Sequence, residues 1–102
     1  MNLCDEFTIR ALLERHGFHF SKSMGQNFLI DPEIPARIAA SSEADEHCGV
    51  LEIGPGIGPL TAELAQRAGK VVSVELDRSL LPILAETMAA HPNVEIVPGD
   101  VM

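Results

Sequence analysis

The hydrophobic and polar positions of the chain follow two spacings, one typical of helices and one typical of buried strands. Residues 8–16 place Ile9, Leu12 and Leu13 on one side of a short amphipathic helix. Short, nearly continuous apolar runs predict buried strands of a parallel sheet. In full, the sequence predicts helices over 8–16, 32–40, 60–68 and 79–90, and strands over 50–53, 71–76 and 94–97. This order predicts an α/β fold of parallel β–α–β units with right-handed crossovers, one half of a doubly wound, mainly parallel sheet.

Capping residues mark where several of these helices begin and end. Asp31 is a typical N-cap, and Pro32 suits the first helical position. Gly17 and Gly69 stand where helices commonly end, because glycine readily adopts the left-handed conformation of that position. Asp77 is expected to cap the last helix.

Three glycines lie between the first strand and the helix that follows it. At Gly54, Gly56 and Gly58 the chain must turn tightly, and glycine permits the positive φ angles that other residues resist. The missing Cβ atoms also let a ligand lie against the backbone, next to the free N–H groups of a helix N-terminus. The turn therefore predicts a site for a nucleoside-bearing cofactor.

Acidic residues at the strand ends extend this prediction. Glu75 ends the second strand 21 residues after Gly54, close to the roughly 20-residue spacing at which an acid reaches a ribose hydroxyl. Asp100 follows the third strand and could accept a hydrogen bond from the exocyclic amine of adenine. The alternatives are that Glu52 is a solvated residue of an edge strand, that Glu75 is an ordinary strand-end acid and that Asp100 is a turn residue.

The spacing of the glycines favours one cofactor class. The dinucleotide fingerprint G-x-G-x-x-G would need glycine at position 59, where the chain has Pro59. The pattern from Glu52 to Gly58 is instead E-x-G-x-G-x-G, which resembles motif I of the class I methyltransferases. We therefore expect S-adenosyl-L-methionine rather than a nicotinamide or flavin cofactor, bound by a Rossmann-like domain.

Four segments in register resemble one family, the ribosomal RNA adenine dimethyltransferases of the KsgA (RsmA) type. They are the loop 21–31 with its G-Q-N-F-L run, the motif I segment 50–61 (V-L-E-I-G-P-G-I-G-P-L-T), the V-E-L-D-R segment 74–78 and the G-D-V segment 99–101. The resemblance extends from Phe18 to the end of the chain. It divides the chain into residues 1–48, the N-terminal helices and the Q-N-F-L loop, and residues 49–102, the first half of the cofactor-binding domain.

The resemblance implies a site for S-adenosyl-L-methionine and a reaction. The implied cofactor-binding residues are Gln26, Asn27, Leu29, Gly54, Gly56, Glu75 and Asp100. Gly54 would contact the amino-acid part of the cofactor, Glu75 the ribose and Asp100 the adenine. The implied reaction transfers methyl groups to N6 of adenosine, twice per base, on two adjacent adenosines near the 3′ end of small-subunit rRNA. The implied partner is the pre-30S ribosomal particle, in the cytoplasm, with a monomeric full-length enzyme.

Two other functions stay open. Methyltransferases of large-subunit rRNA that give macrolide resistance share the Q-N-F-L loop, although the residue at Pro55 favours the small-subunit group. A non-catalytic RNA-binding scaffold of the same fold is the third possibility. The family's catalytic N-L-P-Y or N-L-P-F motif does not occur in the 102 residues. We therefore expect an N-terminal portion of the enzyme, without a catalytic residue, inactive and marginally stable alone, with one edge of the first strand unpaired.

The composition and net charge of the chain indicate further what kind of protein it is. The chain is 46% hydrophobic and 22% charged, as soluble globular proteins are, and we expect neither a secretory signal nor a membrane span. Its net charge of −8 leaves RNA contact to the more basic first 37 residues or to chain beyond these residues. Cys4 and Cys48 are expected to be free thiols. His47 beside Cys48 has no second pair of ligands, so no metal site is expected.

Overall fold

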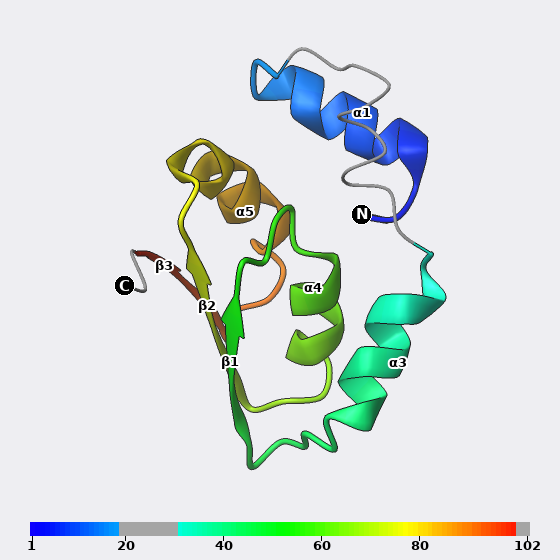
Figure 1. Cartoon of the computed structure of the whole chain (residues 1–102), viewed down its shortest axis with the longest axis vertical. Helices are drawn as coiled ribbons and strands as arrows, with labels where there is room; N and C mark the ends of the chain where they lie inside the picture. The colour runs from blue at the N-terminus through cyan, green and yellow to red at the C-terminus, as the bar shows by residue number, and fades with distance from the viewer. Residues whose placement is uncertain (19–30, 100–102) are drawn as a thin grey trace.

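The computed structural model describes residues 1–18 and 31–99, and Figure 1 shows the path of the chain. Its elements follow in the order α1 (Glu6–Arg15), α3 (Glu33–Ser41), β1 (Gly49–Ile53), α4 (Pro59–Ala65), β2 (Lys70–Glu75), the 3-10 turn η1 (Arg78–Leu80), α5 (Leu81–Thr87) and β3 (Val94–Pro98). The predicted α/β fold and the alternation of strands and helices are confirmed.

The strands form a parallel sheet in the order β1-β2-β3. Ile53 lies opposite Val74, and Val74 lies opposite Val97, so the carboxyl ends of all three strands meet at one edge of the sheet. The helices lie on one side of the sheet in Figure 1, as right-handed crossovers between successive neighbouring strands require. The edge where the strands end is the place where doubly wound folds bind ligands.

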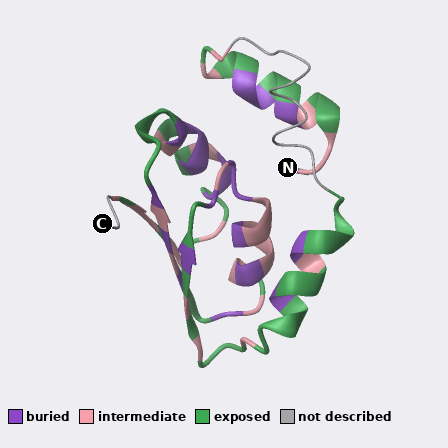
Figure 2. Cartoon of the chain, viewed as in Figure 1, coloured by how far each residue is buried: buried purple, intermediate pink, exposed green. Residues whose placement is uncertain are grey.

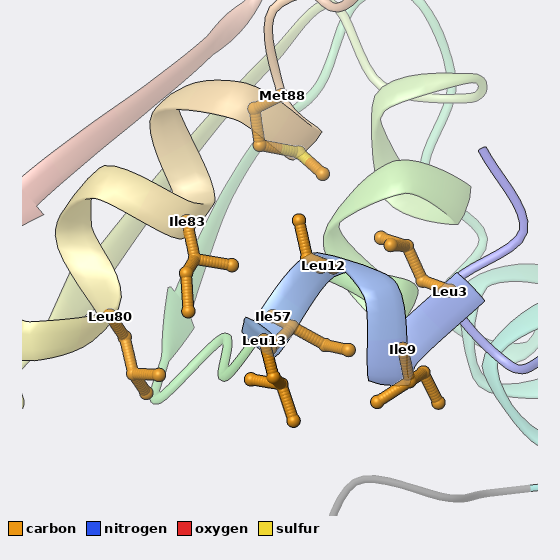
Figure 3. Close-up of a cluster of buried hydrophobic side chains, with 8 residues drawn as sticks. All are labelled: Leu3, Ile9, Leu12, Leu13, Ile57, Leu80, Ile83 and Met88. Carbon is orange, nitrogen blue, oxygen red and sulfur yellow. The ribbon is translucent and has the colours of Figure 1, made fainter. Parts of the chain in front are cut away.

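One core cluster joins α1 to the turn after β1 and to α5 (Figure 3). Its buried members are Leu3, Ile9, Leu12, Leu13, Ile57, Leu80, Ile83 and Met88. The three apolar residues predicted to share one side of the first helix are all buried in this cluster. A second cluster, formed by Ala39, Leu64, Ala68 and Val71, packs α3 and α4 against the sheet. Both N-terminal helices therefore contact the sheet domain, and the predicted division at residue 48 stays a prediction.

The other face of the sheet carries apolar side chains that are exposed. Leu51 is 67% exposed and Ile53 is 55% exposed, and the register places them beside Val72 and Val74. Figure 2 colours each residue by burial, and it shows exposed residues in β1 and buried residues recurring in α4 and α5. Within the described residues, β1 pairs with β2 along one edge only, as predicted.

Local hydrogen bonds at their N-termini decide where the first two helices begin. The first helix begins at Glu6 because the carboxylate of Asp5 accepts the N–H of Thr8. The predicted start of the second helix is one residue early: Pro32, not Asp31, is the N-cap of α3, which begins at Glu33. Asp31 still accepts the N–H of Glu33 through its Oδ1 at 2.9 Å. Gly17 has a φ of +81° and ends α1, as predicted.

Gly69 does not have the predicted role. The helix α4 ends at Ala65, and Gly69 is not among the glycines with positive φ. A Cβ atom on Gly69 would lie 2.3 Å from the carbonyl oxygen of Glu46. Glycine is needed here because two backbone segments approach closely, which no local pattern reports. The last helix is also shorter than predicted, since η1 precedes α5 and α5 ends at Thr87.

A charged cluster ties α1 to α5. The guanidinium of Arg15 donates to Oε2 of Glu86, and Nε2 of His16 lies 2.9 Å from Oε1 of the same carboxylate. The hydrogen bonds from Arg15 and then His16 hold the pKa of Glu86 below its ordinary value of 4.5. A carboxyl whose pKa is lowered by folding stabilises the fold above its unfolded pKa, and this contribution is lost as the pH falls through the folded pKa.

We expect Glu86→Gln to lower the free energy of unfolding near neutral pH, because the neutral amide pairs weakly with Arg15. The difference from the wild-type chain should shrink below about pH 4.5 and vanish in strong acid, where the wild-type carboxyl is protonated too. Urea denaturation at several pH values measures this. As a control, Glu33→Gln removes an exposed pair with Arg37 and should change the free energy by less than about 0.5 kcal/mol. A loss in Glu86→Gln that does not depend on pH would contradict the assignment.

Candidate functional site

The turn after β1 is built on left-handed backbone. Gly54, Gly56 and Gly58 have φ angles of +74°, +64° and +104°, in the region that side chains with a Cβ atom resist. The N–H of Gly54 donates to the carbonyl oxygen of Val74 at 2.9 Å, which fixes the start of the turn to β2. The predicted reason for these glycines, positive φ in a tight strand-to-helix turn, is confirmed.

The three glycines differ in what surrounds them. A Cβ atom on Gly54 or Gly56 would meet nothing within 4 Å, whereas one on Gly58 would lie 2.7 Å from Cε of Met88 and 3.3 Å from Oγ1 of Thr87. Gly54 and Gly56 therefore present bare backbone to open space. Gly58 allows close packing of the turn against α5.

Ile57 anchors the middle of the turn. Its side chain is 1% exposed and lies in the core cluster among side chains of α1 and α5 (Figure 3). Burial of a side chain of this size contributes roughly 1.5–3 kcal/mol. Because Ile57 points into the core, the backbone before it is held open at the carboxyl edge of the sheet, at Gly54 and Gly56, while Gly58 after it packs against α5.

Glu75 lies at the same edge and is bonded to the turn. It is the last residue of β2 and is 6% exposed. Its Oε1 accepts the N–H of Gly56 at 3.2 Å, and its Oε2 accepts the N–H of Asp77 at 2.9 Å. An ionised carboxylate has about four acceptor positions, so two backbone donors orient it while leaving capacity for a ligand. The prediction that Glu75 ends β2 beside the glycine turn is confirmed.

Asp77 has the structural role that was predicted for it. Its Oδ1 accepts hydrogen bonds from the backbone N–H of Ser79 at 3.0 Å and from the Ser79 hydroxyl at 2.6 Å. The residue is the N-cap of η1. This bonding leaves Glu75 as the acid that faces the turn.

Glu52 is not the solvated residue that one interpretation of the sequence allowed. It is 9% exposed, and its Oε1 accepts hydrogen bonds from the hydroxyls of Thr61 at 2.5 Å and Ser73 at 2.7 Å. Thr61 and Ser73 are fully buried, and neither was among the predicted site residues. The sequence offered one sign of this contact, because Ser73 is a polar residue inside an apolar strand. The structure places Ser73 directly opposite Glu52.

Other predicted site residues fall outside the described part of the chain. Gln26, Asn27, Leu29 and Asp100 lie in the segments 19–30 and 100–102, which the structure does not describe. The residue before Asp100 is described: the N–H of Gly99 donates to the carbonyl oxygen of Glu75 at 3.1 Å. The end of β3 is thus bonded to the end of β2 at this edge.

The sequence also led to predictions for the two cysteines and for His47, a residue type that can bind a metal ion. Cys4 and Cys48 are free thiols, as predicted, and burial together with the charges of Glu63 and Asp31 raises the pKa of Cys4. Residues 1–18 and 31–99 contain no group of three or more side chains able to hold a metal ion. In the same ranges no helix is both long and apolar enough to cross a membrane.

A cavity of about 400 Å³ lies elsewhere, between the N-terminal residues, the start of α3 and α4. Its lining includes Cys4, Pro35, Glu63 and His91 but neither the turn glycines nor Glu75. It is therefore separate from the edge described above.

Comparison with known families agrees with this geometry. Residues 17–102 match the family model described as Ribosomal RNA adenine dimethylase. The chain belongs to this family. The predicted membership of the family is confirmed. The predicted Rossmann-like fold of class I methyltransferases is confirmed by solved relatives.

Two curated relatives carry the name Ribosomal RNA small subunit methyltransferase A. The protein from Shouchella clausii is 53% identical over 92 residues, which are 90% of this chain and 31% of that protein. The protein from Streptococcus agalactiae is 49% identical over 102 residues, 100% of this chain and 35% of that protein. The chain thus spans about a third of the length of these relatives.

Two solved structures resemble the fold. The 23S rRNA methyltransferase ErmE is 46% identical with a TM-score of 0.66, over 70% of this chain and 29% of that one. A dimethyladenosine transferase from Plasmodium falciparum is 29% identical with a TM-score of 0.64, over 70% of this chain and 26% of that one.

We expect Gly58→Ala to destabilise the fold more than Gly56→Ala. Both substitutions place a Cβ atom at positive φ, which costs about 1–2 kcal/mol, and only the first also meets Met88. Chemical denaturation of both variants measures the difference.

A double-mutant cycle is the control for this prediction. On a Met88→Ala background the cost of Gly58→Ala should fall toward that of Gly56→Ala, because the contacted methyl group is gone. An unchanged cost would show that Met88 does not restrict the turn.

Proposed function

We propose that this chain is the cofactor-binding part of an S-adenosyl-L-methionine-dependent rRNA adenine dimethyltransferase. One observation carries the proposal: the open backbone of Gly54 and Gly56 lies beside the carboxylate of Glu75, at the carboxyl edge of a parallel sheet. Membership of the adenine dimethylase family supports the chemistry.

The described residues fit this cofactor. Two glycines without neighbours at their Cβ positions leave room for a ligand against the backbone. A buried, oriented carboxylate suits the two hydroxyl donors of a ribose. Gly54 and Gly56 would hold the amino-acid part, and Glu75 the ribose. When bound, the cofactor supplies a methyl group on a positively charged sulfur, which a nucleophilic amine can accept.

The remaining cofactor contacts are proposed from the family resemblance. Asn27, Leu29 and Gln26 would close over the cofactor from the front loop, and Asp100 would accept a hydrogen bond from the adenine amine. All four lie outside the described residues, so the support for them is the family's motif alone. No metal ion takes part in this proposal.

The proposed substrate is a pair of adjacent adenosines near the 3′ end of small-subunit rRNA, each methylated twice at N6. Support comes from the relatives named Ribosomal RNA small subunit methyltransferase A. The pre-30S particle would be the partner and the cytoplasm the compartment, with a monomeric enzyme at full length. Residues that accept hydrogen bonds from the target amine would come from outside the 102 residues, since the N-L-P-Y/F motif is absent from them.

Methylation of large-subunit rRNA is a second candidate. It is favoured by the likeness to ErmE, whose name gives 23S rRNA as its substrate. Pro55 in the glycine turn and the curated relatives near 50% identity favour the small subunit.

Cofactor binding tests the first part of the proposal. We would join residues 1–102 to the remaining sequence of the Shouchella clausii relative (the joined protein) and titrate it calorimetrically with S-adenosyl-L-methionine. Glu75→Ala should raise Kd at least about tenfold, because charge-assisted hydrogen bonds are worth roughly 1.5–3 kcal/mol. Asp77→Ala is the matched control, since its side chain caps η1 and its backbone N–H to Glu75 remains. Equal Kd values in Glu75→Ala and wild type would refute the proposed ribose contact.

Substrate choice is tested with ribosomal particles. Unmethylated small-subunit and large-subunit precursors would be incubated separately with the joined protein and cofactor labelled in its methyl group. We expect label in small-subunit rRNA, at two adjacent adenosines and up to four methyl groups per particle. Because the joined protein takes its C-terminal part from the relative, a protein carrying the complete natural sequence is the control. Label confined to large-subunit rRNA in both proteins would favour the second candidate.

A further inference from the structure

The carboxylate of Glu52 connects three segments that border the open turn. Glu52 precedes Gly54 by two residues on β1, Thr61 follows Gly58 by three residues on α4, and Ser73 precedes Glu75 by two residues on β2. The hydroxyls of Thr61 and Ser73 donate to the same oxygen, Oε1 of Glu52.

These bonds close a ring around the site. From Glu52 the ring crosses to Ser73 through a 2.7 Å hydrogen bond and runs along β2 to Glu75. It then crosses to Gly56 through the 3.2 Å bond from the Gly56 N–H, and returns through the turn to Glu52. The ring therefore connects Glu52 to both groups of the proposed site, the Gly56 backbone and the Glu75 carboxylate.

The partners of Glu52 argue against a direct contact with a ligand, because two buried hydroxyls already donate to its Oε1. Each oxygen of Glu75, in contrast, accepts a single backbone N–H. Glu52 is 9% exposed and both of its hydroxyl donors are fully buried. A buried polar group without hydrogen bonds is unfavourable, and donation from the two hydroxyls satisfies Oε1 of Glu52. Ser73 and Glu75 share the buried face of β2, but Glu75 is the last residue of the strand, whereas Glu52 lies opposite Ser73, inside the sheet.

We infer that Glu52, held by Thr61 and Ser73, is a positioning residue that sets the affinity for the cofactor without touching it. The inference rests on the proposed function, because it takes S-adenosyl-L-methionine as the ligand of the turn. Glu52 would act by setting the distance between the backbone of Gly56 and the carboxylate of Glu75. These two groups would bind different parts of the cofactor.

The test compares Kd for S-adenosyl-L-methionine in variants of the joined protein, at a temperature well below every unfolding midpoint. Glu52→Ala should raise Kd about tenfold or more, and Ser73→Ala and Thr61→Val about threefold to tenfold each. Glu52→Gln should stay within about threefold of wild type, because the amide oxygen can accept both hydroxyl donors. This rescue by the neutral residue separates positioning from a role for the charge.

Val71→Ala is the matched control. Val71 lies on β2, on the same face as Ser73, and is fully buried. Its truncation leaves a cavity and lowers stability but keeps the ring of hydrogen bonds. We expect a lower unfolding midpoint with an unchanged Kd. If Glu52→Ala does not fold, Ser73→Ala and Thr61→Val carry the test, since each removes one hydroxyl only.

Two results would overturn the inference. Kd values in Ser73→Ala, Thr61→Val and Glu52→Ala that match Val71→Ala would show that the hydrogen bonds serve stability alone. A loss in Glu52→Gln as large as in Glu52→Ala would show that the charge itself acts on the ligand. Failure of the unsubstituted joined protein to bind would instead overturn the proposed function, and this inference with it.

Discussion

The site depends on a backbone bend that glycine adopts readily and other residues resist. Three positive φ angles within five residues are tolerated because glycine occupies each position and because the bend is fixed at several points. Ile57 is buried below it in the core cluster, and Glu75 accepts the N–H of Gly56 beside it. Without these contacts the glycines would make the segment flexible, since glycine loses the most conformational entropy on folding. The rest of the fold supplies the anchors: α1 and α5 bury Ile57, and β2 presents Glu75.

The two buried carboxylates near this edge, Glu52 and Glu75, differ in the groups that donate hydrogen bonds to them. Glu52 receives hydrogen bonds from two side-chain hydroxyls that are themselves buried. Glu75 receives them from two backbone N–H groups of the turn and of the segment after β2. Hydroxyl donors enclose the first carboxylate inside the sheet–helix interface. Backbone donors orient the second at the rim, where the end of β3 also arrives through Gly99.

Local patterns predicted the parallel units, the positive φ turn and the strand-end position of Glu75, because spacing and residue type alone determine these features. They failed where distant segments meet. Glycine is needed at position 69 because of the backbone carbonyl of Glu46, and at position 58 the side chain of Met88 packs where a Cβ atom would lie. The burial of Glu52 depends on Thr61 and Ser73, contributed by other elements. The family's motifs supplied the candidates Gln26, Asn27, Leu29 and Asp100, which neither period nor capping singles out and which the described structure does not include.

The strand order β1-β2-β3 has a consequence for how such a site comes into being. Gly56 and Glu75 are 19 residues apart in sequence, and their strands can pair only after a helical crossover has closed. Non-local parallel pairing of this kind slows folding, because chain entropy is lost before the contacts form. During synthesis, the bend emerges before the carboxylate that will hold it. The carboxyl edge of the sheet, where Gly56 lies beside Glu75, therefore forms late in folding, because it requires the assembled sheet.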